Sequence, residues 1–528
     1  MTLALEIESG TDYSAKEARA AEAKAARATE DDLRSHVRQL LALSGNLTLQ
    51  TLSGFGIWLS TFIWIGTLGP VATGGCTLGN MLANITGFSL IFGMATALDS
   101  LCAQSYGAKQ YQRCGLHTQR AILILTLFSL PCIAVWWQAE WILHNVLFIP
   151  SEIAFHAGRW TRTMSAGLWP LISFECLKKL MQARNIVWPA VLTTTIGLGF
   201  NLVANYYVFR IRKWGFNSAA WIVPIQNWVH FVVFVVILSL RKWMISRRRE
   251  TSPSYDKLPE ESGHGSAGAH AEIATATESK ASHPSEPDPE DDWPPLSAAV
   301  FDDWKSFLEL GVPGALSLFI EWGSFELAAS IAGQLGAVGL AAHGIFMSTS
   351  GLFYMLPLSI AQATTTVAGH IIGQGAAVRE DGGQAAARRI IMLGIAMDTI
   401  YGLVAAAVLM LVVRPVWGKI FTVDPATQEL VTKTMPFMAM YAIVDATKCI
   451  TLNILRSGGM PSITVAVNAF VCVVVLLPLG WYLAIHQSKG LGGLWFSMSV
   501  AWALATVGFG FVLHNLDLRK LRVIEGSA

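Results

Sequence analysis

The chain has 528 residues, of which 53% are apolar or aromatic and 14% are charged, with a net charge of +1. Soluble domains carry about 25% charged residues, so this composition argues against a cytosolic enzyme or a nucleic-acid-binding protein. Outside residues 1–38 and 241–304, only about 9% of the residues are charged, which is the composition of a membrane protein. We therefore predict an all-α integral membrane protein.

The amino-terminal part of the chain begins with a polar segment and continues with apolar stretches. Within the expected cytoplasmic tail 1–38, residues 12–36 predict a short helix or a frayed tail, with Ser14 and Glu17 at the spacing of a capping box. No cleavable signal peptide is expected in this tail. Residues 39–240 then predict a bundle of six membrane helices, each near the ~20 residues that a bilayer requires. The six apolar stretches are 39–67, 76–103, 118–140, 153–177, 187–209 and 216–240.

A polar segment separates these stretches from the rest of the chain. Residues 241–300 are rich in Ser, Pro, Glu and His and poor in apolar residues, which is typical of disordered chain. We expect a cytoplasmic disordered linker here, acting as a tether or a regulatory segment. Residues 301–515 predict a second six-helix bundle, and a cytoplasmic tail is expected at 516–528. The apolar stretches of the second bundle are 306–331, 340–368, 388–413, 428–455, 461–484 and 492–514.

The two halves share local features, which indicates an internal repeat. Pro189 leads into the fifth span and Pro461 into the eleventh, while Gly107 follows the second span and Gly373 the eighth. Because each half has an even number of spans, the repeats are expected to be parallel and related by an axis along the membrane normal. Most Lys and Arg residues lie on the side of the termini and the linker, which predicts both termini in the cytoplasm.

The chain carries no sequence motif of an enzyme. GxSxG, HExxH and GxxxxGK[ST] do not occur in it. The seven cysteines lie in or beside apolar stretches without CxxC spacing, and we interpret them as small buried hydrophobic residues rather than metal or redox groups. We therefore expect a protein that is not an enzyme and holds no cofactor or metal. A membrane enzyme is the weakest alternative.

Ionisable residues inside the predicted spans are the main functional candidates, because each costs roughly 2.5–3.5 kcal/mol at a helix centre. Glu321 and Glu326 lie in one span, and their spacing places the two carboxyl groups ~140° apart around the helix. Neither has a basic residue within one helical turn. A carboxyl group in apolar surroundings without a counter-ion is suited to carry protons. The alternative is a glutamate that is hydrogen-bonded to its neighbours and only joins helices.

Asp445 is the next candidate proton carrier. Lys448 follows it by three residues, so a helical ion pair that keeps Asp445 charged is a real alternative. Asp398 and His230 also lie inside spans, but they are weaker candidates because they have no supporting neighbours.

Two further acidic residues are expected to be structural. Asp99 lies near the cytoplasmic end of the second span, where it is expected to cap a turn or position a loop. Glu175 is followed by Lys178 and Lys179 at helical spacing, which favours an ion pair.

Aromatic and Met side chains lie next to the candidate carboxylates or one turn from them. These are Trp322, Phe325, Tyr354, Met355 and Tyr441. Aromatic faces and flexible Met side chains would suit a flat organic cation, so Glu321 and the four aromatic residues are candidate substrate ligands. Ordinary helix packing explains each of them equally well.

Three motifs resemble eukaryotic members of the multidrug and toxic compound extrusion (MATE) family. GMATALDSLCAQSYGA at residues 93–108 is similar to the family's second-span signature. MQARN at 181–185 is similar to the LQAQN that precedes span five, and IEWGSFE at 320–326 resembles the EWWSFE of span seven. The resemblance covers about 38–240 and 300–515.

The resemblance implies twelve transmembrane helices, arranged as two pseudo-symmetric six-helix bundles around a central cavity. It also implies export of organic cations, drugs or amphiphilic metabolites in exchange for protons. The family's coupling carboxylates match Glu321, Glu326 and Asp445 of this chain. The residues that belong to the family's second-span motif are Asp99, Gln104 and Gly107.

Three positions depart from the family pattern. Gly323 stands where a second aromatic residue is usual, which could widen the pocket and shift substrate choice. Gly45 and Asn46 replace the usual first-span proline, which leaves the bending of that span open. His370 stands where Asn is common, and we expect a packed neutral histidine there, with titration near neutral pH as the alternative.

We therefore hypothesise a proton-coupled antiporter that works by alternating access, with small organic cations or amphiphiles, protons and membrane lipids as partners. One alternative is a sodium-coupled antiporter of the same fold, with Asp445, Thr447 and Thr451 as sodium ligands. Another is a lipid scramblase or a non-transporting membrane sensor. We expect a monomer in the plasma or vacuolar membrane, with no nucleic-acid partner.

Overall fold

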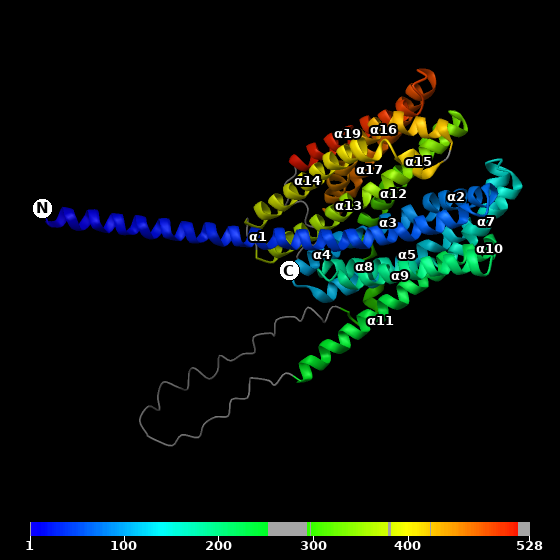
Figure 1. Ribbon diagram of the computed structural model, residues 1–528. Helices are drawn as coiled ribbons and strands as arrows, with labels where there is room; N and C mark the ends of the chain where they lie inside the picture. The colour runs from blue at the N-terminus through cyan, green and yellow to red at the C-terminus, as the bar shows by residue number, and fades with distance from the viewer. Residues whose placement is uncertain (1, 252–292, 296, 379–381, 423, 516–528) are drawn as a thin grey trace.

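The computed structural model describes residues 2–251, 293–295, 297–378, 382–422 and 424–515. Within these residues the chain is almost entirely helical and contains no strand (Figure 1), so the predicted all-α class is confirmed. Residues 252–292 of the expected linker and the expected tail 516–528 lie outside the described residues.

The amino-terminal half forms one bundle, coloured from blue to green in Figure 1. The expected polar tail and the first span form one continuous helix, α1 (Thr2–Gly66), so Gly45 and Asn46 do not interrupt it. The predicted fourth span is divided into two helices at Gly167. The further elements, with η marking short π or 3₁₀ segments, are α2 (Pro70–Ala83), η1 (Asn84–Phe88), α3 (Ser89–Ala95), α4 (Ala97–Gly107), α5 (Tyr111–Trp137), α6 (Ala139–Trp141), η2 (Ile142–Val146), α7 (Ser151–Ser165), α8 (Leu168–Ala183), α9 (Trp188–Tyr206), η3 (Tyr207–Ile211), α10 (Phe216–Ala220) and α11 (Ile222–Thr251).

The carboxy-terminal half forms the second bundle. Pro189 and Pro461, which mark the internal repeat, both lie in the first turn of a helix, α9 and α17, where a missing N–H leaves no helical hydrogen bond unmade. The elements of this half are η4 (Ala298–Phe301), α12 (Trp304–Gln334), α13 (Gly336–Val378), α14 (Gly382–Val408), η5 (Leu409–Val413), α15 (Trp417–Phe421), α16 (Pro425–Ser457), α17 (Pro461–Ala469), η6 (Phe470–Leu476), α18 (Leu477–Trp481), η7 (Tyr482–His486) and α19 (Gly490–His514).

Nine helical segments within the described residues are long and apolar enough to cross a membrane. They cover the second, third, sixth and all later predicted spans. The other three predicted spans are also helical, in α1, in α7 with α8, and in α9 with η3. Large apolar side chains remain exposed on the outside of the bundles, such as Leu411 at 79% and Phe511 at 70%, as expected for a surface that faces lipid.

The two bundles meet through helices of the first, second, seventh and eighth spans. Helix α1 packs against α13, and α3 packs against α12, so the contacts follow the internal repeat. The hydroxyl groups of Thr51 and Ser359 lie 3.0 Å apart across the first contact. In the second contact, a Cβ atom on Gly93 would come within 2.5 Å of the Cα of Ala315. A glycine is therefore needed there for the two backbones to approach.

The bundles lie close together where α4 packs against α13 and diverge toward the end that holds α2, α7 and α15 in the view of Figure 1. The amino-terminal extension of α1 and the carboxyl end of α11 lie at the first of these ends (Figure 1). We call it the linker end and the opposite end the far end.

Candidate functional site

The carboxy-terminal bundle contains a buried ion pair between α12 and α16. Glu321 is 7% exposed and Lys448 1% exposed, and the Nζ of Lys448 donates a hydrogen bond to Oε1 of Glu321. The Nη2 of Arg456 lies 4.0 Å from Oε2 of the same carboxylate. The expectation that Glu321 has no counter-ion is therefore wrong, because its cations come from another helix rather than from its own.

Polar groups of two neighbouring helices orient Arg456. Its Nη2 donates a hydrogen bond of 3.2 Å to the hydroxyl of Ser317, which lies one turn before Glu321 on α12. The Nδ2 of Asn468 on α17 donates to the same hydroxyl at 3.0 Å. A buried polar group needs such partners, and here they join α12, α16 and α17 around the carboxylate of Glu321.

Asp445 lies one turn before Lys448 on α16 and is also 7% exposed. Its Oδ1 accepts a hydrogen bond of 2.8 Å from the indole nitrogen of Trp502. The Nζ of Lys448 lies 4.1 Å from the centroid of the same indole ring, but the described side chains form no ion pair between Lys448 and Asp445. The alternative of a local ion pair is wrong in this conformation, because Lys448 turns to Glu321.

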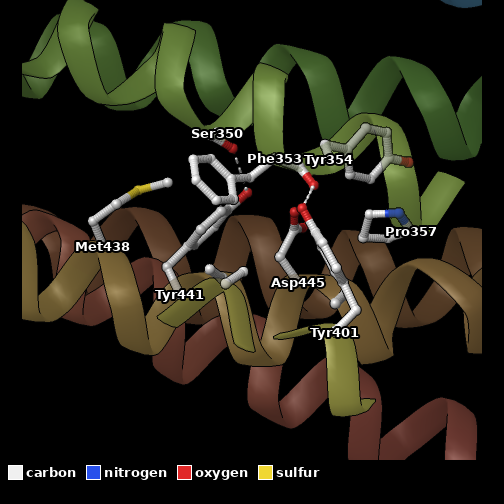
Figure 2. A pocket seen from close by; sticks show the side chains of 11 residues that line it. Ser350, Phe353, Tyr354, Pro357, Tyr401, Met438, Tyr441 and Asp445 are labelled. Carbon is white, nitrogen blue, oxygen red and sulfur yellow. Dashed lines mark hydrogen bonds between the residues drawn. The ribbon is translucent and has the colours of Figure 1, made fainter. Parts of the chain in front are cut away.

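A small cavity lies beside Asp445, between α13, α14 and α16 (Figure 2). Asp445 and Tyr401 both line this space (Figure 2). The hydroxyl of Tyr401 donates to the carbonyl of Phe353 at 2.9 Å, and that of Tyr441 accepts from Ser350 at 3.4 Å. The space holds about one water molecule, so it is too small for an organic cation in this conformation.

The other expected substrate ligands lie around this region and at the contact between the bundles. Tyr354 lines the cavity. Phe325 packs edge-on against Trp502, with ring centroids 5.6 Å apart. Trp322 instead reaches Phe92 of α3, with centroids 6.3 Å apart. Trp322 therefore contacts the other bundle in this conformation, whereas Phe325 and Tyr441 both pack on Trp502.

Glu326 lies apart from the ion pair, as its angular separation from Glu321 on α12 predicts. It is half-buried, and no hydrogen bond or ion pair to it is formed by the residues that the structure describes. Outside its own stretch of helix, no described residue has an atom within 4 Å of the place that a Cβ atom on the neighbouring Gly323 would take. The open space beside Gly323 agrees with the expectation that this departure widens the region.

Asp99 joins two helices of the amino-terminal bundle. Both of its carboxylate oxygens lie 2.6 Å from the Nζ of Lys179, which links α4 to α8. Glu175 pairs with Lys178 at 2.5 Å, three residues on, as predicted. Asp99 lies in the first turn of α4 but does not cap it, so its structural role comes from an ion pair rather than from a turn.

Gly107 and Gly373 each lie against the backbone of the other's helix, where α4 crosses α13 at the linker end. A Cβ atom on Gly107 would clash with the backbone of His370, and one on Gly373 would clash with the carbonyl of Gln104. The glycines that mark the internal repeat therefore permit a close backbone contact between the two bundles. The motif residues Gln104 and Gly107 thus lie at this crossing.

His370 ties the same crossing to the end of α8. Its Nε2 lies 2.5 Å from the carbonyl of Ala183, and its Nδ1 lies 3.3 Å from Nδ2 of Asn185. A neutral ring protonated at Nε2 donates to the carbonyl and accepts from the amide, which satisfies both nitrogens. This arrangement agrees with the expected packed neutral histidine and adds a polar contact between the bundles.

The described residues do not assemble the sodium ligands suggested by the sequence. The hydroxyl of Thr447 bonds to the carbonyl of Ile443 at 3.3 Å, and that of Thr451 bonds to the carbonyl of Thr447 at 3.0 Å. They follow Asp445 by two and six residues, which places them about 200° and 240° from it around the helix. Both hydroxyls therefore face away from the Asp445 carboxylate.

Sequence reasoning missed the partners that organise the site. Nothing in the sequence pairs Glu321 with Lys448, which lies 127 residues away, or assigns Trp502 to Asp445. The three-residue spacing between Asp445 and Lys448 instead favours an ion pair between these two residues. The only sequence signal for the true pair was the presence of an acid in one predicted span and a base in another.

Comparisons with known proteins agree with the arrangement of the helices. The MatE family model matches residues 48–207 and 313–482, more than half of the chain. Protein DETOXIFICATION 16 of Arabidopsis thaliana is 26% identical over 487 residues, covering 92% of this chain and 89% of that protein. Multidrug and toxin extrusion protein 2 of Oryctolagus cuniculus is 27% identical over 484 residues, covering 91% and 71%. The solved structure of the eukaryotic MATE transporter AtDTX14 matches with a TM-score of 0.77 at 20% identity, covering 93% and 98%, so the two chains share a fold.

Proposed function

Because the chain belongs to the multidrug and toxic compound extrusion (MATE) family, we propose that it is a proton-coupled antiporter that works by alternating access. Its substrates are organic cations, drugs or amphiphilic metabolites. The names of relatives that span most of this chain, a DETOXIFICATION protein and a multidrug and toxin extrusion protein, support this substrate class.

The buried charges of the carboxy-terminal bundle carry the proposal. A bundle that faces lipid retains ionisable groups only at considerable cost, so they mark function more often than packing. The charge of Glu321 is balanced by an ion pair with Lys448. Asp445 instead accepts a hydrogen bond from an indole and has no ion-pair partner among the described side chains. Asp445 is therefore the member of this site that gains most from binding a proton, and Glu321 can exchange Lys448 for a proton or a substrate cation.

The transport cycle follows from the sign of these charges. When the site is open to the cytoplasm, ionised Glu321 and Asp445 attract a cationic substrate. Proton uptake from the other side neutralises the carboxylates and releases the substrate, with Glu326 as a further proton acceptor on α12. Aromatic faces bind flat organic cations, and in this proposal they are supplied by Trp322, Phe325, Tyr354 and Tyr441.

Alternating access requires the contacts at the linker end to open. These contacts include the crossing of Gly107 and Gly373 and the hydrogen bonds of His370. Each pH unit across the membrane supplies about 1.4 kcal/mol per proton. This free energy is comparable to the net contribution of one hydrogen bond. The proton gradient can therefore drive the breaking of only a small number of such contacts in each cycle.

Transport by the purified chain in vesicles with an imposed pH gradient tests the proposal. A panel of fluorescent cations and anions serves as substrate, and Glu321→Gln is expected to abolish export driven by the gradient. Glu429→Gln is the matched control, because the Glu429 side chain is 66% exposed and pairs with Lys433 of the next turn. The proposal fails if Glu321→Gln exports at the wild-type rate and remains driven by the gradient.

The same vesicles distinguish other coupling ions and functions. Loss of export when Na⁺ is replaced by choline, with no response to pH, would replace proton coupling by sodium coupling. Movement of lipid without solute flux would indicate a scramblase.

We further propose that the chain is a monomer in the plasma or vacuolar membrane, with both termini and residues 241–300 in the cytoplasm. The excess of Lys and Arg on that side supports this orientation. Protease cleavage of tags at the two termini, in sealed vesicles of known sidedness, checks it.

A further inference from the structure

Asp398 lies on a face of α14 that is pressed against two other helices. Gly394 and Gly402 lie one turn before it and one turn after it on the same face. A Cβ atom on Gly394 would clash with the side chains of Thr364 on α13 and Ile450 on α16, and one on Gly402 would come within 3.0 Å of the backbone of α16. Asp398 therefore points into the junction of α13, α14 and α16.

Among the described residues, the carboxyl group of Asp398 has no compensating partner there. The side chain is 0% exposed, and neither carboxyl oxygen has a hydrogen-bond partner among the described residues. The hydroxyl of the neighbouring Thr399 is already placed 3.2 Å from that of Thr447 and bonds to its own helix. A buried polar group without a partner is rare in folded proteins and calls for an explanation.

Among the described residues of the helices packed against α14, no basic residue is within electrostatic reach of this carboxyl group. On α16, Asp445 and Cys449 are the titratable groups within electrostatic reach of Asp398, while Lys448 is bonded to Glu321. Tyr401 lies one turn along α14 itself. A carboxylate buried without a cation is very costly, so Asp398 carries a proton in this conformation.

The same junction contains the small cavity beside Asp445. Tyr401 and Ala405, three and seven residues after Asp398 on α14, line this cavity together with Asp445 and Tyr354. Figure 2 shows Asp445 and Tyr401 in the lining of this cavity. The cavity thus has Asp445 in its lining and adjoins the stretch of α14 that follows Asp398.

We propose that Asp398 is a second proton-carrying group, which exchanges its proton with Asp445 through the cavity lined by Tyr401 and Tyr354. In the exchange, the O–H bond of Asp398 breaks and an O–H bond forms on Asp445, so the negative charge moves from Asp445 to Asp398 and the total charge is unchanged. This inference deepens the proposed function. It makes the coupling site a pair of acids that share one proton between α14 and α16.

Infrared spectroscopy of the full chain in lipid nanodiscs tests the pair directly, because a protonated carboxyl group has its own carbonyl stretch. In the wild type, we expect this signal to change with pH. Asp398→Asn should remove one component of this carbonyl signal. In Asp445→Asn, the component that belongs to Asp398 should remain, but the midpoint of its pH titration should move by about one pH unit, because the two acids interact. Glu429→Gln, at an exposed ion pair, should leave the titration unchanged.

The proposal is overturned if the component that Asp398→Asn removes does not change with pH in the wild type. Asp398 would then be a neutral acid that keeps its proton throughout. A response to added Na⁺ at constant pH, instead of a response to pH, would also overturn it. If Asp398→Asn does not fold, Asp398→Leu provides the same comparison without a carboxyl group. The infrared titration does not depend on transport. If the vesicles show no export driven by the pH gradient, this result counts against the proposed function but not against the proton exchange between Asp398 and Asp445.

Discussion

Lys448 on α16 donates a hydrogen bond to Glu321 on α12, and both side chains are almost completely buried. The pair joins two helices of the second bundle at the level of the candidate coupling site. Removal of one partner from a buried pair leaves an uncompensated charge, whereas removal of both can be nearly neutral. Structural and functional contributions of this pair can therefore be separated by single and double substitutions.

Lys448→Met is expected to destabilise the protein by about 3–5 kcal/mol, because it leaves Glu321 buried without its main cation. The double variant Glu321→Gln/Lys448→Met should recover most of this stability but should not recover export driven by a pH gradient. Thermal unfolding in detergent measures the first effect, and vesicle transport the second. If the effects of Glu321→Gln and Lys448→Met simply add in the double variant, the two side chains do not interact energetically.

Gly107→Ala and Gly373→Ala are each expected to weaken the contact between the bundles at the linker end, because the added Cβ atom meets the backbone of the opposing helix. A cysteine introduced at Gln182, which is 4% exposed and bonds to Thr366 of the other bundle, should then react faster with a polar thiol reagent. Gly344→Ala is the matched control, since no described residue outside its own stretch of helix has an atom within 4 Å of its Cβ position. Unchanged reactivity in both variants would argue against the proposed role of this crossing.

His370→Ala is expected to have a similar effect through a different contact, because it removes both hydrogen bonds that connect α13 to Ala183 and Asn185. Loss of one buried hydrogen bond typically costs about 1 kcal/mol, so a several-fold increase in the labelling rate at Gln182 is expected. His370→Gln, which can still donate to the Ala183 carbonyl, should recover part of the wild-type protection. Equal labelling of the two variants would indicate that ring packing against Tyr106 matters more than the hydrogen bonds.

Asp424, just before α16, gives a prediction about pH outside the spans. Its side chain accepts hydrogen bonds from the backbone nitrogen and the hydroxyl of Thr427, at 2.9 and 2.5 Å, and these bonds lower the pKa of Asp424. A carboxyl group with a lowered folded-state pKa stabilises the protein above its unfolded-state pKa, and this contribution disappears as the pH falls through the folded-state value. Asp424→Ala should therefore lower the Tm at neutral pH, and the difference should shrink in acid.

The matched control is Asp424→Asn, which keeps a side-chain acceptor at the start of the helix without the charge. It should show a smaller loss at neutral pH and little dependence of that loss on pH. A loss that is as large in acid as at neutral pH for Asp424→Ala would contradict the assignment of the effect to ionised Asp424.

The helical ranges of the spans and the local ion pair of Glu175 with Lys178 could be predicted because they depend on neighbours along the chain. Hydrophobic length determines which segments can cross a bilayer, and helical spacing brings residues three positions apart together. Helical spacing also predicted an ion pair between Asp445 and Lys448, and this prediction failed. Lys448 on α16 instead donates its hydrogen bond to Glu321 on the neighbouring helix α12. Inside an apolar bundle, the geometry between helices decides which charges meet.

The sequence by itself determined the membrane character, the repeated halves and the identity of the few buried acids, since each follows from composition and spacing. Only the tertiary structure decided how these acids differ. It gave Glu321 a cation and Asp445 an indole donor, and it left Asp398 without a hydrogen-bond partner among the residues that the structure describes. The physical reason is that a charge in a low-dielectric interior depends on groups within a few ångströms of it, and helix packing brings those groups from distant parts of the chain.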